Sequence, residues 1–220
     1  MARHFEALNN DYIDAGNPSI LNLTGDEVTL SVWIKLESTT MEGKIIAKWA
    51  DQGDRFQYLL SNNSGDKCLF AIFNDGTKIA QGTTILVVGQ WYHLAGTYDG
   101  SNLRVYCNGI QEDSTPATGN MSSTTAPVRI GAGSGGLGTE NPFDGEIGHV
   151  AIWDKPLTDG EIKSLANGIN PLNIRSESLL FYAPLNGQTP EYDVIGGLDM
   201  TVNGTIVAEE PPIPNSIKAP

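Results

Sequence analysis

Apolar and polar residues alternate along residues 28–36 of this chain. The apolar positions share one parity and are Val28, Leu30, Val32, Ile34 and Leu36. Successive side chains of a β-strand point to opposite faces, so this period of two predicts a strand that buries one face. Trp33 is out of phase with its apolar neighbours, and we therefore expect it on the opposite face of the sheet.

Comparable runs recur at short spacing along most of the chain. We predict strands at residues 43–49, 56–60, 68–73, 91–98, 103–107, 128–130, 147–153, 179–184 and 200–207. Asp99-Gly100 and Asn108-Gly109 end two of these runs, and such pairs provide the positive φ angles that tight hairpins require. Residues 131–138 are glycine-rich and predict a loop. Many short strands joined by turns are typical of an all-β protein.

One short helix is expected near the end of this series. Thr158 and Glu161 have the spacing of a capping box, in which each side chain bonds the backbone N–H of the other residue. Apolar Ile162 and Leu165 follow at helical spacing, and Gly168 is placed to end the helix.

The composition fits one domain with an acidic surface. At 220 residues the chain suits a single large all-β domain, which we place at residues 1–207. Residues 208–220 are rich in proline and predict a C-terminal arm. The formal net charge of −13 disfavours nucleic acid as a partner, because that binding depends on Lys and Arg neutralising phosphates. Such a surface suits Ca²⁺ or serves solubility alone.

The apolar stretches and the cysteines suggest in which compartment the protein is made and whether it contains a disulfide. Residues 1–6 contain no apolar run typical of a secretion signal, and no stretch approaches the ~20 apolar residues of a membrane helix. We therefore expect a soluble protein made in a cytoplasm. Cys68 and Cys107 both lie in predicted strands, and they are either buried thiols or a disulfide between neighbouring strands.

Two segments resemble a known family. Residues 91–100 (WYHLAGTYDG) and 103–109 (LRVYCNG) resemble the laminin-G-like signature, and residues 143–154 (FDGEIGHVAIWD) resemble a pentraxin stretch. The similarity covers roughly residues 5–168. It implies a concanavalin A-like fold of the lectin and glucanase superfamily: a two-sheet antiparallel jelly-roll sandwich with one short helix.

The C-terminal part carries a second resemblance. Residues 178–197 resemble a segment that usually precedes a laminin-G-like domain, whereas here it follows one. Either the domain is circularly permuted, or residues 179–207 complete the same sandwich. Similar layouts occur in tailed-bacteriophage proteins, and the resemblance therefore implies a virion protein, such as a capsid decoration or tail subunit.

Catalysis is not expected. Glucanases of this fold carry two acids on one face of a strand in a Glu-x-Asp-x-Glu motif. The nearest run here is residues 144–149, in which Gly148 replaces one acid. No Gly-x-Ser-x-Gly elbow is present either. We predict a binding or structural protein rather than an enzyme.

The resemblance also implies a possible calcium site. Pentraxins hold Ca²⁺ with an Asp-Asn pair and an acidic loop. Asp54 falls at the position of the Asp, but Arg55 replaces the Asn, and the loop keeps only Glu140 and Asn141 as oxygen donors. We take Asp54, Glu140 and Asn141 as the candidate metal ligands.

A glycan site pairs an aromatic platform with amides and carboxylates. Trp49 stands next to Ala50-Asp51-Gln52, and we expect it to be exposed and to bind ligand with Asp51, Asp54 and Asn63. The preferred interpretation is a virion-associated protein that docks on other virion subunits and displays a glycan-binding surface, assembled in a host cytoplasm and capable of forming a homo-oligomer. The alternative is a calcium-dependent lectin module that binds cell-surface glycans.

Overall fold

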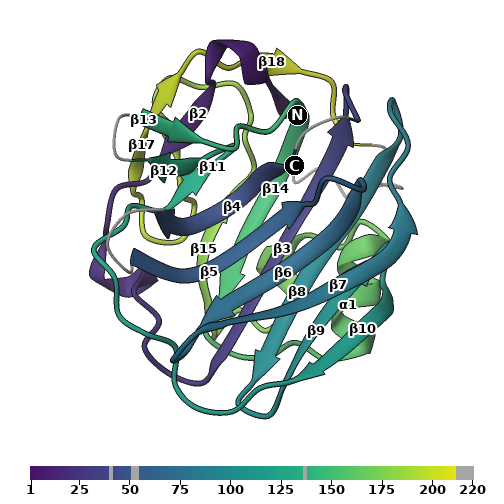
Figure 1. The fold of residues 1–220 in the computed structure, drawn as a ribbon. Helices are drawn as coiled ribbons and strands as arrows, with labels where there is room; N and C mark the ends of the chain where they lie inside the picture. Colours follow the sequence, from purple (N-terminus) through teal and green to yellow (C-terminus); the bar gives the residue numbers. More distant parts are fainter. Residues whose placement is uncertain (40–41, 51–54, 136–137, 212–220) are drawn as a thin grey trace.

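A computed structural model of the chain describes residues 1–39, 42–50, 55–135 and 138–211. These residues form two β-sheets that pack face to face, with one α-helix on the outside of one sheet (Figure 1). Three short 3₁₀ helices, Ala7–Asn9, Ser19–Leu21 and Pro171–Asn173, lie in the connections. The predicted all-β sandwich is confirmed.

Sheet A has eight strands in the described part of the chain. In spatial order they are β10 (Ile110–Pro116), β9 (Asn102–Cys107), β8 (Trp91–Asp99), β3 (Glu27–Leu36), β14 (Gly145–Trp153), β1 (Ala2–Phe5) and β18 (Ile206–Ala208), and β15 (Leu179–Ala183) pairs with β14. All of these pairings are antiparallel.

Sheet B has ten strands among the described residues. In spatial order they are β16 (Glu191–Tyr192), β17 (Asp199–Asn203), β2 (Tyr12–Asp14), β11 (Arg129–Ile130), β4 (Gly43–Ala50), β5 (Arg55–Asn62), β6 (Lys67–Phe73) and β7 (Thr77–Ile85). A small hairpin of β12 (Gly133–Gly135) and β13 (Gly138–Glu140) attaches to β4, where Ser134 pairs with Ala50.

The core lies between the two sheets and follows the period of two in the sequence. All five apolar residues of the 28–36 alternation belong to the main core cluster, and each is at most 1% exposed. Phe70 and Ile72 of β6 meet them from the opposite sheet. Trp33 lies on the other face of β3, as expected, where its ring makes an edge contact with His93.

The helix α1 (Asp159–Ala166) covers the outer face of sheet A (Figure 1). Its capping box is formed as predicted, with Thr158 Oγ1 accepting from the Glu161 N–H and the Glu161 carboxylate accepting from the Thr158 N–H. Ile162 and Leu165 face the sheet and pack in a second apolar cluster that contains Trp153. This face of the sandwich is therefore closed by the chain itself.

Three features of the fold differ from the sequence-based expectations. The glycine-rich segment at 131–138 is not only a loop, since it contributes β12 and begins β13. The predicted strand at 200–207 is two strands, β17 and β18, which break at Gly204 (φ +81°) and enter different sheets. The edge strands β7 and β10 were not predicted, because most of their residues are polar or exposed and lack a clean apolar period.

The two cysteines lie in different sheets, and most of the predicted arm lies outside the described residues. Cys68 on β6 and Cys107 on β9 are buried free thiols in different sheets. Residues 212–220 of the predicted C-terminal arm lie outside the described residues. No helix of the described chain is long and apolar enough to cross a membrane.

Candidate functional site

A groove of about 250 Å³ runs across the outer face of sheet B. In Figure 1 this face is turned toward the viewer, and no helix of the described chain lies over β4 to β7. The residues that line the groove come from five strands and two connections: Glu42, Lys44, Trp49, Leu59, Leu69, Ala71, Thr77, Ile79, Glu140 and Asn141. The groove lies on the uncovered side of the sandwich and is our candidate site.

The floor of the groove is apolar and firmly packed. Trp49, Leu59 and Ala71 form a small buried cluster on neighbouring strands, separate from the main core. The Trp49 ring lies 4.5 Å from the Phe56 ring, centroid to centroid. Side chains at cross-strand neighbours hold one another in place, so this floor is rigid before any ligand binds.

One end of the groove is polar. Lys44 on β4 forms a short ion pair with Glu140 on β13, and its side chain is only 3% exposed. Gly133 makes room for this lysine, because a Cβ at that position would lie 2.7 Å from Lys44 Cδ. Glu42 is exposed at the same end, and the Asn141 carbonyl accepts from the Lys44 N–H at 2.9 Å.

The structure brings together three of the residues predicted from the sequence. Trp49, Glu140 and Asn141 all line the groove. Asn63 does not, since it sits in the β5–β6 turn and its Oδ1 accepts from the backbone N–H groups of Gly65 and Lys67 at 2.9 and 3.0 Å. The predicted positions Asp51 and Asp54 lie outside the described residues.

The expectation that Trp49 is exposed was wrong. Its exposed fraction is 8%, because Phe56, Leu59 and Ala71 on the neighbouring strands β5 and β6 pack against it. Only part of the ring borders the groove. The sequence reasoning also missed Lys44 and Ile79, although the alternation of residues 67–73 places Leu69 and Ala71 on the outer face and could have identified the floor.

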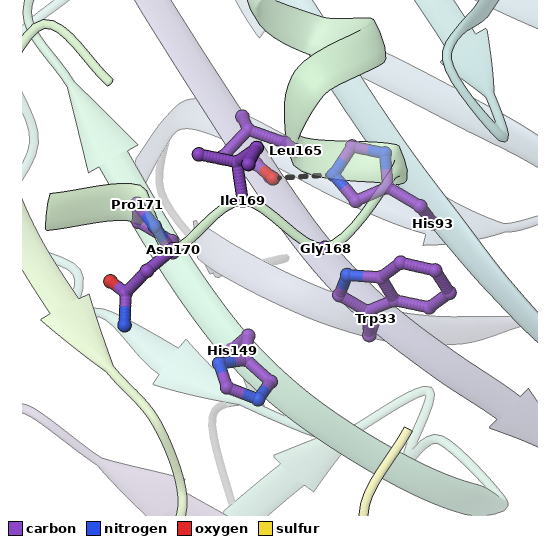
Figure 2. Close-up of a pocket in the computed structure, with 9 residues that line it drawn as sticks. Trp33, His93, His149, Leu165, Gly168, Ile169, Asn170 and Pro171 are labelled. Atoms are coloured by element: carbon purple, nitrogen blue, oxygen red, sulfur yellow. Dashed lines mark hydrogen bonds between the residues drawn. The ribbon is translucent and has the colours of Figure 1, made fainter. Parts of the chain in front are cut away.

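A second cavity lies on the opposite side of the sandwich, between sheet A and the residues that follow α1 (Figure 2). Ser31, Trp33, His93 and His149 line it, and the segment 168–171 closes it. Its volume of about 20 Å³ holds roughly one water molecule. This cavity is therefore too small to be a ligand site comparable with the groove.

The two histidines of this cavity are neutral at neutral pH. His93 Nε2 lies 2.9 Å from Ser31 Oγ, the contact dashed in Figure 2, and His149 Nδ1 lies 2.7 Å from the Tyr182 hydroxyl. Burial lowers the pKa of His93 to about 3 and that of His149 to about 4, because a charged ring loses its hydration there. The remaining nitrogens, His93 Nδ1 and His149 Nε2, have no hydrogen-bond partner among the described residues.

Comparison with known proteins identifies the family. The model of the concanavalin A-like lectin/glucanases superfamily (Laminin_G_3) matches residues 8–163. The chain belongs to this superfamily. The match spans β2 to α1 and includes every strand that forms the groove, so the resemblance seen in residues 91–109 and 143–154 is confirmed.

The curated relatives are much longer proteins. Pappalysin-1 of Mus musculus is 28% identical over 160 residues, and pappalysin-1 of Homo sapiens is 27% identical over 162 residues. Each match covers 66% of this chain and 10% of the relative. The chain thus spans about a tenth of the length of these relatives.

Solved structures share the fold at low sequence identity. A protein from Bacteroides ovatus whose proposed role is carbohydrate binding superposes with a TM-score of 0.73 and 21% identity, over 93% of this chain and 58% of the other. A heptameric SAP-like pentraxin from Limulus polyphemus gives 0.59 and 20%, over 90% and 94% of the two chains. The CBM40 domain of a Ruminococcus gnavus sialidase, bound to α2,3-sialyllactose, gives 0.61 and 12%, over 76% and 94%.

Proposed function

We propose that this chain is a non-catalytic carbohydrate-binding module and that the groove on sheet B is its binding site. One observation carries the proposal. The groove combines an aromatic and aliphatic floor with a polar end, on the one broad sheet face that no helix of the described chain covers. Sites for small ligands have this combination of apolar lining and a few placed polar groups.

The groove supplies what a sugar ring needs from a protein. The C–H face of the ring would lie on Leu69, Ile79 and the part of the Trp49 ring that borders the groove, and its hydroxyl groups would donate to Glu42 and to the side-chain carbonyl of Asn141. Because the floor is already packed, little side-chain entropy is lost when a ligand binds. Membership of a lectin superfamily and likeness to carbohydrate-binding structures also support this function.

Hydrolysis is not part of the proposal. Glycosidases use two carboxyl groups on either side of the scissile bond, one of them a proton donor. Among the described residues, two carboxylates line the groove, and Lys44 holds that of Glu140 in an ion pair, so Glu42 is the other. A binding module requires neither a proton donor nor a nucleophile.

Calcium stays a separate prediction. Asp54, the residue on which the site was centred, lies outside the described residues, and Glu140 is paired with Lys44. Asn141 borders Glu140 and could supply one oxygen. Titration with Ca²⁺ followed by calorimetry, with and without EDTA, measures whether the isolated chain binds the ion.

The test uses variants of the groove with a matched control. We expect the wild type to bind at least one member of a panel of gluco-, galacto-, manno- and xylo-oligosaccharides on an array, with confirmation by calorimetry. Trp49→Ala and Ile79→Asp should weaken that binding at least tenfold, because each removes apolar contact area from the groove. Ile79 is 44% exposed, so its variant should fold even if Trp49→Ala does not.

Ile110→Asp is the control for these variants. Ile110 is also an exposed isoleucine on an edge strand, but it lies on sheet A and does not border the groove. Its variant should bind like the wild type. Absence of binding to every oligosaccharide, or equal binding by the wild type and Ile79→Asp, would rule out the proposed function.

The interpretation as a virion subunit also stays a prediction, since no contact or surface described above favours it. A virion subunit and a binding module differ in the mass that we expect to measure in solution. A virion subunit should form a defined oligomer in solution, which light scattering after size-exclusion chromatography would detect.

A further inference from the structure

We propose that the groove selects uncharged glycans and rejects those that carry sulfate or carboxylate groups. This inference rests on the proposed function and names the class of ligand that the groove accepts. Its basis is the ion pair between Lys44 and Glu140, which occupies the one cation among the described residues that line the groove and leaves acceptors of hydrogen bonds beside it.

Lys44 is the one cation among the described residues that line the groove. Its side chain lies against Gly133 of β12, with the site of a Cβ 3.0 Å from Nζ, and reaches Glu140 on β13. Only 3% of the lysine side chain is exposed. An ammonium group held in this way cannot turn to a ligand without giving up its ion pair with Glu140 at a poorly solvated position, which is costly.

Two nearby lysines, Lys48 and Lys78, do not take the place of Lys44 as a cation in the groove. Lys48, on the same strand, donates to Asn17 Oδ1 at 2.5 Å and to the Ala126 carbonyl at 2.8 Å. Lys78 lies between Thr77 and Ile79, which line the groove, so the alternation of β7 points it to the other face. There it borders a separate depression with Asn74 and Pro116.

The groups that remain available favour hydroxyl donors. Glu42 is exposed at the polar end, and Asn141 is partly exposed beside it. A carboxylate accepts hydrogen bonds and donates none. A sulfate or carboxylate on the ligand would meet Glu42 without a compensating cation, and the net charge of −13 adds a long-range repulsion.

The first experiment compares matched ligands on the wild-type chain. An array and calorimetry would use each neutral oligosaccharide that binds together with its sulfated, sialylated and uronic-acid counterparts. We expect every anionic counterpart to bind at least tenfold more weakly at low salt. A wild type that prefers a sulfated or sialylated ligand would overturn the inference while leaving carbohydrate binding intact.

The second experiment removes the ion pair of Lys44. Glu140→Gln takes away the carboxylate partner of Lys44, and Glu42→Gln removes an equal charge from the same end and leaves that ion pair intact. We expect Glu140→Gln to raise affinity for the anionic ligands at least fivefold, with a gain that added NaCl abolishes. Glu42→Gln should change the ratio of anionic to neutral affinity by clearly less.

Two further outcomes complete the test. If Glu140→Gln does not fold, Lys44→Met provides the alternative variant, and it should keep or increase the rejection of anionic ligands. Equal effects of Glu140→Gln and Glu42→Gln would show that charge alone decides, and would overturn the role given to Lys44. Failure of the wild type to bind any glycan would reject the proposed function, and this inference with it.

Discussion

At the scale of single residues, the position of His93 on its strand determines its burial and its charge. His93 has the sequence context of any strand residue, yet its side chain is fully buried on the outer face of sheet A. Its ring is held by Ser31 and Trp33 of the adjacent strand β3. Burial lowers the pKa of His93 to about 3, because a charged ring would lose its hydration there, and the ring is therefore neutral at pH 7.

This burial predicts an acid-sensitive stability. The pKa of His93 is about 3 in the folded chain and close to 6.5 once the chain unfolds, so the unfolded state binds more protons between these values. Stability should therefore fall as the pH drops from 6.5 toward 3, by about 2 kcal/mol from this group at pH 5. Urea unfolding at pH 7 and pH 5 measures the change.

The matched variant for this effect is His93→Gln. Glutamine keeps a polar group near Ser31 but does not titrate. The variant should be less stable at pH 7, yet its loss of stability between pH 7 and pH 5 should be smaller than that of the wild type. Equal losses in both proteins would assign the acid sensitivity to other groups.

At the scale of elements, the edge strand β7 is protected by side chains rather than by another strand. The Glu112 carboxylate on β10 accepts from the Thr83 N–H at 2.8 Å, the Thr84 N–H at 3.1 Å and the Thr84 hydroxyl. Asp113 accepts from the Gln81 N–H at 3.0 Å. Unpaired N–H groups at a sheet edge invite pairing with another chain, and these carboxylates occupy them while joining the two sheets.

Removal of this contact should weaken the edge. Glu112→Ala takes away three hydrogen bonds to a charged group, and we expect a loss of about 2 kcal/mol in the free energy of unfolding. Gln111→Ala, at an exposed neighbour on the same strand, should change stability by less than about 0.5 kcal/mol. Similar losses in the two variants would contradict the role of Glu112.

At the scale of the whole molecule, the two ends of the chain complete one sandwich. β1 lies between β14 and β18, so in the described part of the chain the first strand pairs with the last. Buried Arg3 donates to Glu191 Oε1 at 2.7 Å and to the carbonyl and hydroxyl oxygens of Thr205 at 2.9 and 3.0 Å. Residues 179–207 thus contribute strands to both sheets.

The buried pair of Arg3 and Glu191 should be essential for stability. Glu191→Ala leaves the Arg3 guanidinium buried without its carboxylate, and we expect a loss of about 3–5 kcal/mol in urea unfolding. Glu27→Ala breaks the solvent-accessible pair with Lys155 and should cost far less stability, because solvent screens such a pair. If the two substitutions cost the same, the link between the chain ends contributes little.

The sequence by itself determined most of the strands, the hairpin turns, the capped helix and the family. These features depend on a period of two, on residues that tolerate positive φ such as Asn108 and Gly109, and on a capping box, all of which act within a few residues. The face occupied by Trp33 follows from the same local rule.

Only the tertiary structure decided which side chains meet. Lys44 and Glu140 are 96 residues apart in the chain, and their ion pair exists because the β12–β13 hairpin attaches beside β4. Trp49 is buried because its cross-strand partner Phe56 and the nearby side chains of Leu59 and Ala71 pack in one cluster with it. Strand order is set by long-range pairing and packing, which no local period encodes, and so the groove and its charge could be described only from the folded chain.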